Sequence, residues 1–290
     1  MKKDRLQIYS YDLFHRGLSY FISSRLKKHP LLRQLYYLFR SSFVYIGKYK
    51  LFIDKSDTVV SESLINHGVW EPDILHLFQK YIRPGNTIVE IGAHIGDFTL
   101  SASQAVGPKG KVFAFEPSSH NLSFLRKSLS ENRIQNVTLI PKAVSNKSGQ
   151  INLYLSKDNQ GDHRTYNFST QSATETVKTV SLNDYFTSLP TIHFLKIDIQ
   201  GSEFQALLGM SKLLQKRKIK ILVSELYPEG LKQAGSSWQK YLKLLQKSGF
   251  NIYQIPSLAP INFDDIKKYY KDDPEFTTNI IGFLHNNKHH

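Results

Sequence analysis

The distribution of apolar residues from residue 86 onward alternates between two patterns. Short, nearly continuous apolar runs predict buried β-strands, and the residues between them recur at the spacing of amphipathic helices. The predicted strands are 86–93, 111–117, 136–145, 193–201, 218–228, 251–257 and 277–285. The predicted helices between them are 97–107, 120–133, 202–216 and 237–250. Apolar strands of this kind are buried on both faces, so we expect an α/β fold with helices on both faces of a mostly parallel, seven-stranded sheet.

The region of about residues 146–186 interrupts this alternation. It contains two more strand-like stretches, "INLYLS" and "TVKTVSLNDYF", separated by the polar stretch "KDNQGDHRTYNFSTQSATE". A polar loop of this length in a compact domain is usually functional or disordered. Because it leaves the core between two strands of the predicted sheet, we expect it to reach the edge where parallel sheets bind ligands.

Residues 1–50 differ from the rest of the chain in composition. They hold eleven lysines and arginines against two aspartates, within a net charge of +14 for all 290 residues, and their apolar residues recur at helical spacing. We therefore predict a basic, aromatic-rich helical extension before a domain of residues 51–290. We expect its apolar stripe to pack on that domain, with contact to a membrane surface or a partner as the alternative. Because the charge is concentrated there, a nucleic acid is not expected as partner.

The cellular location is constrained by what the sequence lacks. No apolar run approaches the roughly 20 residues of a membrane span, and polar residues follow the N-terminal charges where a signal peptide would be apolar. The chain has no cysteine, which removes disulfides and thiolate metal sites. The expected location is the cytoplasm, with peripheral membrane contact if the extension binds lipid. The sequence predicts no oligomeric state.

The turn after the first predicted strand, "VEIGAHIGDF", has glycine only at Gly92 and Gly96. A dinucleotide turn needs glycine at positions i, i+2 and i+5, but His94 and Asp97 stand at the last two, and the Gly-Lys-Ser/Thr of a P-loop is absent. The turn is therefore not expected to hold a diphosphate. Glu116, at the end of the next strand, is placed to accept hydrogen bonds from both ribose hydroxyls. A nucleoside without phosphates, with a positively charged end near the acids of the turn, describes S-adenosylmethionine.

Six stretches, in order along the chain, resemble the FkbM family of methyltransferases: "VEIGAHIGDFTL", "VFAFEPSSHNLSFLRKSL", "LIPKAVSNKSGQINLYLS", "SLNDYF", "FLKIDIQGSEFQALLG" and "SEL". The resemblance covers about residues 71–250 and implies a Rossmann-like class I methyltransferase fold that uses S-adenosylmethionine. It also implies O-methylation of a hydroxyl on a sugar or polyketide. The family more often has glutamate at Gln200 and aspartate at Asn183, so an essential carboxylate is not expected at either position.

The resemblance assigns three groups of residues to the cofactor. Those matching the turn at the methionine end are Glu90, Gly92, Ala93 and Gly96. Those matching the ribose contact are Glu116, Pro117 and Asn121. Those matching the contact to the adenine edge are Ala143 and Val144.

Transfer of a methyl group to a hydroxyl needs an aligned acceptor and the removal of one proton. Asp198 ends a strand before a glycine turn, so we expect it at the ligand edge as a cofactor contact or as the base, with a helix cap as the alternative. Lys196 points to the same face and would keep Asp198 ionised or act as the base itself. His163, in the polar loop, is the second candidate base, because imidazole titrates near neutral pH; a solvated loop residue is the alternative.

The residues predicted to contact the acceptor are His163, Arg164, Trp70, Glu71 and Glu225. Arg164 would bind a phosphate or carboxylate of the acceptor. For Glu71 the alternative is a helix cap, and for Glu225, which ends the strand "ILVSE", it is a turn residue. No metal is expected, because the His, Asp and Glu residues lack a ligand spacing such as HExxH.

These observations together predict an S-adenosylmethionine-dependent O-methyltransferase acting on a hydroxyl of a sugar, glycan or glycolipid-type acceptor. One alternative is an RNA 2′-O-methyltransferase, since Lys196 and Asp198 also suit ribose chemistry. Another is an O-methyltransferase of small metabolites or polyketides. The non-enzymatic alternative is a cofactor-binding module whose N-terminal helices recruit a partner or a membrane.

Overall fold

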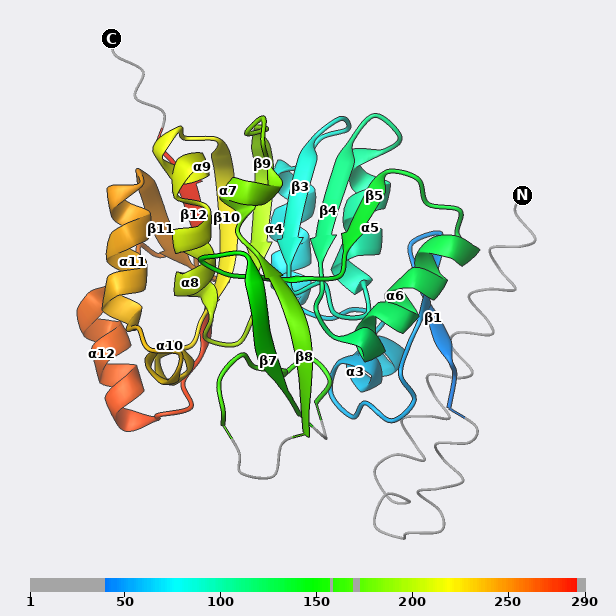
Figure 1. Cartoon of the computed structure of the whole chain (residues 1–290), viewed down its shortest axis with the longest axis horizontal. Helices are drawn as coiled ribbons and strands as arrows, with labels where there is room; N and C mark the ends of the chain where they lie inside the picture. Colours follow the sequence, from blue (N-terminus) through cyan, green and yellow to red (C-terminus); the bar gives the residue numbers. More distant parts are fainter. Residues whose placement is uncertain (1–39, 157–158, 169–172, 286–290) are drawn as a thin grey trace, which may run out of the picture.

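The computed structural model describes residues 40–156, 159–168 and 173–285. Its main sheet contains the strands β3 (Thr87–Ile91), β4 (Lys111–Phe115), β5 (Val137–Ile140), β9 (Ile192–Ile197), β10 (Ile219–Leu226), β11 (Phe250–Gln254) and β12 (Thr278–Leu284). Their order across the sheet is β11-β12-β10-β9-β3-β4-β5 (Figure 1). The strands from β10 to β5 pair in parallel, whereas β12 is antiparallel to β10 and β11. The predicted mostly parallel, seven-stranded sheet is confirmed.

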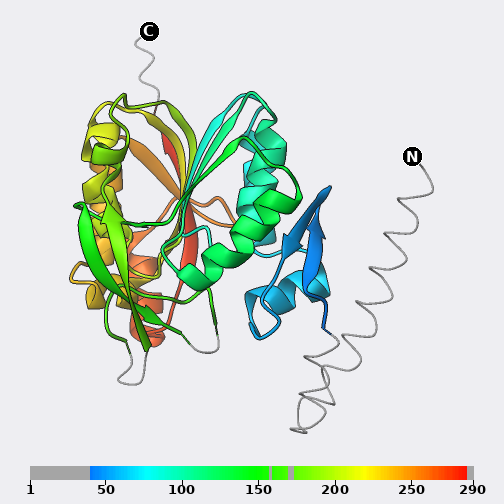
Figure 2. The same ribbon diagram turned by 45° about the vertical axis from the view of Figure 1, so that its right-hand side comes forward.

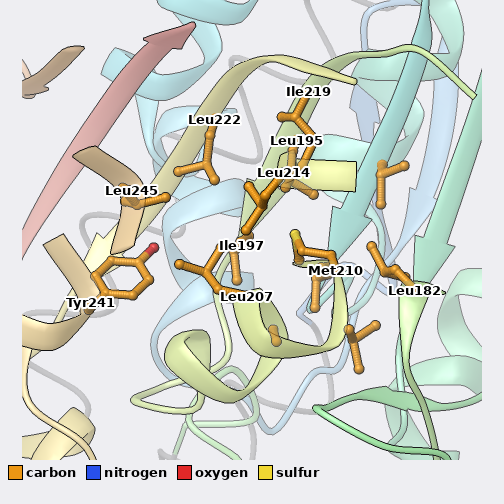
Figure 3. Packing of buried hydrophobic residues seen from close by; sticks show 14 of the residues in the cluster. Leu182, Leu195, Ile197, Leu207, Met210, Leu214, Ile219, Leu222, Tyr241 and Leu245 are labelled. Carbon is orange, nitrogen blue, oxygen red and sulfur yellow. The ribbon is translucent and has the colours of Figure 1, made fainter. Parts of the chain in front are cut away.

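Helices cover both faces of this sheet, as predicted. One face carries α4 (Pro72–Tyr81), α5 (Asp97–Val106) and α6 (Ser119–Glu131), and the other carries α8 (Glu203–Gly209), α9 (Ser211–Gln215) and α11 (Trp238–Lys247) (Figure 2). Alternate strand residues serve the two faces. Phe194 of β9 packs with α4 and α5, whereas its neighbour Leu195 packs with α8 and α9. Figure 3 shows the second of these cores, where Leu195 and Ile197 lie near Leu207 and Leu214.

A hairpin and a short helix precede the sheet. The hairpin consists of β1 (Phe43–Ile46) and β2 (Tyr49–Phe52), and α3 (Val60–His67) follows it. The hairpin is fixed to α6, because Ser128 Oγ accepts the Phe52 N–H at 2.9 Å and Asn132 bonds both the N–H and the C=O of Lys50. Residues 43–50 are therefore strands where a helical extension was expected, and the expected boundary at residue 50 falls inside β2. The remainder of that extension lies outside the described residues.

The region that interrupts the alternation of strands and helices forms a second, three-stranded sheet together with residues 143–144. Its strands β6 (Ala143–Val144), β7 (Gly149–Leu155) and β8 (Ala173–Val180) lie in the order β6-β8-β7. The predicted strand 136–145 is thus divided between two sheets at Pro141, which has no N–H to donate to a ladder. After β8 the chain forms α7 (Leu182–Tyr185), capped by Ser181, and not a continued strand.

Three helical features differ from the prediction. The predicted helix 202–216 is two helices, which meet at Met210. Two further helices, α10 (Pro228–Gln233) and α12 (Phe263–Asp272), were not predicted. In α12 Phe263, Ile266 and Tyr270 recur at helical spacing and pack on the core, so the sequence carried a signal for this helix. Within the described ranges, no helix combines the length and apolarity that crossing a bilayer would need.

Candidate functional site

A cavity opens at the carboxyl ends of β3, β4 and β9. The space within it is about 970 Å³, counting the part that is open to solvent. The sequence-predicted residues that line it are Trp70, Glu90, Gly92, Ala93, Glu116, Pro117, Asn121, Ala143, Val144, His163, Lys196 and Asp198. They meet because parallel strands end at a common edge of the sheet. We call this cavity the cofactor cleft.

The glycine turn after β3 packs closely on the end of β9. Gly92 has φ +88°, and a Cβ at this position would overlap the carbonyl oxygen of Asp198. The Asp198 N–H in turn donates to Ile91 O at 3.0 Å. Gly96 also has a left-handed backbone, but it does not line the cleft, and a Cβ there would overlap Leu125 of α6. The predicted cofactor contact of Gly96 is therefore replaced by a packing contact between α5 and α6.

Glu116 follows β4 and holds the glycine turn in place. Its carboxylate accepts the backbone N–H of His94 at 2.8 Å and that of Ser118 at 2.9 Å, and Ser118 also caps α6. Burial raises the pKa of Glu116 to about 7, although these hydrogen bonds oppose the rise. Each carboxylate oxygen retains acceptor capacity, so hydroxyl donors from a ribose can still bind.

Lys196 lies at the centre of the acidic part of the cleft. Its Nζ is 3.0 Å from Asp198 Oδ2 and 3.3 Å from Glu71 Oε2. Burial opposes ionisation of Asp198, but Lys196 and the Gln200 amide, 3.0 Å from Oδ1, outweigh it and lower the pKa of Asp198 below its usual value. Asp198 does not cap the following helix, because the side chain of Glu203 accepts the backbone N–H groups of that turn.

Two further carboxyl groups face the same part of the cleft. Burial raises the pKa of Glu90 to about 8 and that of Asp97 to about 6, in both cases against the opposing effect of Lys196. Thr99 donates a hydrogen bond to Glu90 from the first turns of α5. Carboxyl groups outnumber ammonium groups here, so a positively charged ligand would be favoured.

The segment 159–168, between β7 and β8, forms one wall of the cleft. His163 lies in this wall, and its Nδ1 accepts the N–H of Ser156 at 3.1 Å. The neutral ring therefore carries its proton on Nε2, and burial lowers the pKa of His163 to about 4. The predicted role of general base is corrected: in this arrangement His163 offers a hydrogen-bond donor.

Arg164 is bound within the protein and does not line the cleft. Its Nε and Nη2 lie 2.8 and 3.1 Å from the carboxylate of Asp162, and its guanidinium lies 4.6 Å from the centre of the Phe168 ring. The pKa of Arg164 is raised, because the Asp162 carboxylate more than offsets burial. The predicted contact between Arg164 and an acidic acceptor is therefore not supported.

Glu71 and Glu225 also differ from their predicted places. Glu71 precedes α4 but its side chain does not cap the helix. Its carboxylate binds Lys196 and the amide of Asn279. Glu71 lines a neighbouring cavity, which shares Trp70 with the cofactor cleft. Glu225 lies in β10 away from the cleft lining, and burial raises its pKa well above the usual value. Glu225 therefore does not contribute to the lining of the cleft.

Several residues of the cleft were not predicted from the sequence. Those lining it are Val60, His94, Asp97, Lys142, Asn159, Gln160, Gly161, Thr165, Gln200 and Ser202, and the apolar residues Ile91, Phe115, Leu153 and Ile199 complete the lining. Asp97, Gln200 and Ser202 follow strand-ending glycine turns, so their position at the ligand edge was a usable signal. Val60 carried no comparable signal, because its neighbours in the cleft are distant in sequence, whereas Lys142 directly precedes the predicted residues Ala143 and Val144.

The cleft fits S-adenosylmethionine by the chemistry of its side chains. Among the described residues, two buried polar atoms of the cleft have no hydrogen-bond partner, Nε2 of His94 and Oδ1 of Asn121. These atoms can pair with a polar ligand, which fits the rule that buried polar groups are normally paired. The acids around Lys196 suit a cation, and Glu116 beside Asn121 suits ribose hydroxyls. The described part of the chain contains no cluster of three metal-binding side chains.

Comparison with known proteins gives both a family and several relatives. The hexuronic acid methyltransferase AglP of Haloferax volcanii is 27% identical over half of this chain and 58% of its own length. The catalytic subunit TRM61 of a tRNA (adenine(58)-N(1))-methyltransferase from Candida albicans is 30% identical over 29% of this chain and 25% of its own length. This chain thus spans well under two thirds of either relative.

A solved structure, a SAM-dependent methyltransferase from Aquifex aeolicus, has a TM-score of 0.43 and 14% identity, and the alignment covers 79% of this chain and 95% of that one. The family match is to the methyltransferase FkbM domain and spans residues 90–252, more than half of the chain. It includes the glycine turn, the segment 159–168 and the turn of Asp198. The chain belongs to the FkbM family of methyltransferases, and its methyl donor is S-adenosylmethionine.

Proposed function

We propose that this enzyme methylates a hydroxyl group of a sugar in a glycan or glycolipid. The observation that carries the proposal is the ionised Asp198 carboxylate, which lines the cofactor cleft and is held by Lys196 and Gln200. A hydroxyl substrate must lose its proton during methyl transfer, and an ionised carboxylate can take up that proton. The likeness to a relative named as a hexuronic acid methyltransferase supports a saccharide as the acceptor.

The residues of the cleft divide the chemical work between binding and proton transfer. When bound, S-adenosylmethionine supplies a methyl group on a positively charged sulfur. Asp198 takes up the proton of the acceptor hydroxyl, a contribution of about 10²- to 10⁴-fold for a positioned base. The Nε2–H of His163 orients the acceptor, and Glu116 and Asn121 bind ribose hydroxyls. Alignment by these groups contributes the larger part, about 7–11 kcal/mol for well-oriented reactants.

A glycolipid acceptor would bring the enzyme to a membrane surface. The concentration of basic residues in 1–50 supports contact of that segment with anionic lipid. The same segment gives the RNA alternative its charge, and the likeness to a tRNA methyltransferase subunit covers only 84 residues. RNA must therefore be tested as a methyl acceptor beside the saccharides.

Labelled S-adenosylmethionine, incubated with extracted polysaccharide, glycolipid and RNA, tests the proposal. We expect label in a saccharide-containing pool, recovered after acid hydrolysis as an O-methyl sugar. Asp198→Asn should lower kcat at least about 10²-fold, while the affinity for S-adenosylhomocysteine, measured by calorimetry, changes much less. Label that enters RNA alone, with binding that weakens steeply as salt rises, would contradict the proposal.

A further inference from the structure

A second cavity adjoins the cofactor cleft beside the small sheet. Its lining residues come from β6 and β7 on one side and from α8 and the end of α10 on the other. Figure 1 shows the arrangement of these four elements. The two cavities share four lining residues, which are Ala143, Val144, Thr165 and Ser202. We call the second cavity the polar groove; its remaining walls are formed mainly by residues 145–147, Gln150, Thr179, Gln205 and residues 233–235.

The polar groove differs from the cofactor cleft in its chemistry. Most of its side chains carry hydroxyl or amide groups, Lys147 is its one charged residue, and none of the described residues that line it is acidic. The amides of Gln150 and Gln205 make no hydrogen bond to the described part of the chain, so they are available to a ligand. An amide both donates and accepts hydrogen bonds, and so do the neighbouring hydroxyls of a sugar.

The wall between the two cavities carries the turn of the candidate base. Thr165 Oγ1 and Ser202 Oγ lie 2.5 Å apart, and the Tyr166 hydroxyl donates to Gln200 O at 2.8 Å. These contacts join the segment 159–168 to the turn that follows Asp198. A ligand in the groove therefore lies against the same turn that presents Asp198 to the cleft.

We propose that the polar groove binds the sugar unit next to the one that is methylated, so that the acceptor is an oligosaccharide or longer glycan and not a single sugar. This inference rests on the proposed function. A nucleic-acid strand does not fit the groove, because neutralising several phosphates requires several lysines or arginines and the groove has Lys147 alone. Uncharged hydroxyl groups match the amides of Gln150 and Gln205 instead.

A chain-length series tests the inference. The acceptors are saccharides of one to six units, fractionated by size from a mild acid hydrolysate of mixed polysaccharides. Gln150 and Gln205 lie outside the cofactor cleft, and Gln239, exposed on α11, provides the matched control. We expect wild-type kcat/KM to increase about tenfold or more from one unit to the longer acceptors, as two or more hydrogen bonds are added.

The variants test whether the increase in kcat/KM with acceptor length comes from the polar groove. Gln205→Ala and Gln150→Ala should each raise KM for the longer acceptors about fivefold, the effect of one lost hydrogen bond. Their kcat, their KM for the one-unit acceptor and their unfolding midpoints should not change, and Gln239→Ala should match the wild type throughout. Equal use of short and long acceptors, or variants without effect on the long ones, would overturn the inference and leave the proposed function standing. Transfer to no saccharide of any length would instead refute the proposed function itself.

Discussion

At the scale of single residues, Lys196 determines the charge balance of the cleft. Its ammonium group is buried and lies within 3.3 Å of both Glu71 and Asp198. Lys196→Met would leave both carboxylates without their cation, and breaking a buried pair in this way costs about 3–5 kcal/mol. We expect a loss of this size in the free energy of unfolding, measured with urea. Lys243→Met, at an exposed position of α11, is the control and should be nearly neutral.

Glu203 acts on the site through the turn that it holds. One of its carboxylate oxygens, Oε1, accepts the N–H groups of Ile199 and Gly201, each at 3.1 Å. Glu203→Ala leaves both unpaired, which should cost about 3 kcal/mol of stability and displace Asp198. Glu203→Gln keeps an acceptor of the same shape and should restore stability and kcat.

Comparing kcat with KM for S-adenosylmethionine separates this positioning role from a general loss of folding. If the Gln variant is as defective as the Ala variant at neutral pH, charge and not geometry is what Glu203 provides.

At the scale of elements, the close approach of β3 and β9 depends on Gly92. Gly85 has nearly the same backbone, with φ +85° against +88°, but a Cβ there would meet nothing within 4 Å. Gly85→Ala therefore measures backbone strain alone, about 1 kcal/mol. Gly92→Ala adds the overlap with the Asp198 carbonyl, so the two turns must separate. We expect Gly92→Ala to lose several times more stability in denaturant unfolding and to abolish measurable cofactor binding; equal losses would show that the close approach is dispensable.

The elements also show how far the sequence could be interpreted. The strands of the main sheet were predictable because burial on both faces leaves apolar runs such as residues 87–91. The division at Pro141 was missed, because a two-residue strand leaves little periodicity. The helix α12 was missed although Phe263, Ile266 and Tyr270 recur at helical spacing. The meeting of strand-end residues such as Glu116 and Asp198 in one cavity was predictable from topology. The pairing of Arg164 with Asp162 was not, because it depends on side-chain conformation and not on spacing.

At the scale of the whole molecule, the sheet concentrates chemistry at one edge. The main sheet brings carboxyl groups from β3, β4 and β9 together there, and the segment 159–168 forms one wall of the same cleft. The small sheet thus contributes twice: it walls the cofactor cleft and forms one side of the polar groove. In the proposed arrangement the small sheet therefore contacts both the cofactor and the acceptor, whereas the acidic side chains that suit a cation come from the main sheet.

The buried carboxyl groups make the stability of the cofactor-free protein depend on pH. Burial raises the pKa to about 8 for Glu90 and about 7 for Glu116 and Glu203, so the folded state binds more protons than the unfolded state up to about pH 8. These groups therefore make the free energy of unfolding fall as pH rises. His94 and His163, with pKa values lowered by burial to about 4, act in the opposite direction below about pH 6.5. The net fall should thus appear between about pH 6.5 and 8.

Glu90→Gln isolates the largest contribution, because glutamine resembles the protonated acid and does not titrate. Relative to the wild type, the variant should gain on the order of 5 kcal/mol at pH 8.5 and almost nothing at pH 4.5. Urea unfolding of both proteins across this range, without cofactor, measures the difference at each pH. A difference that is the same at both ends would mean that Glu90 titrates normally in the folded protein. The same two proteins can also be compared at saturating ligand. If the stability difference between them is smaller with S-adenosylmethionine than with S-adenosylhomocysteine, the positive charge of the methyl donor acts on this carboxyl group, as the acid-rich turn requires.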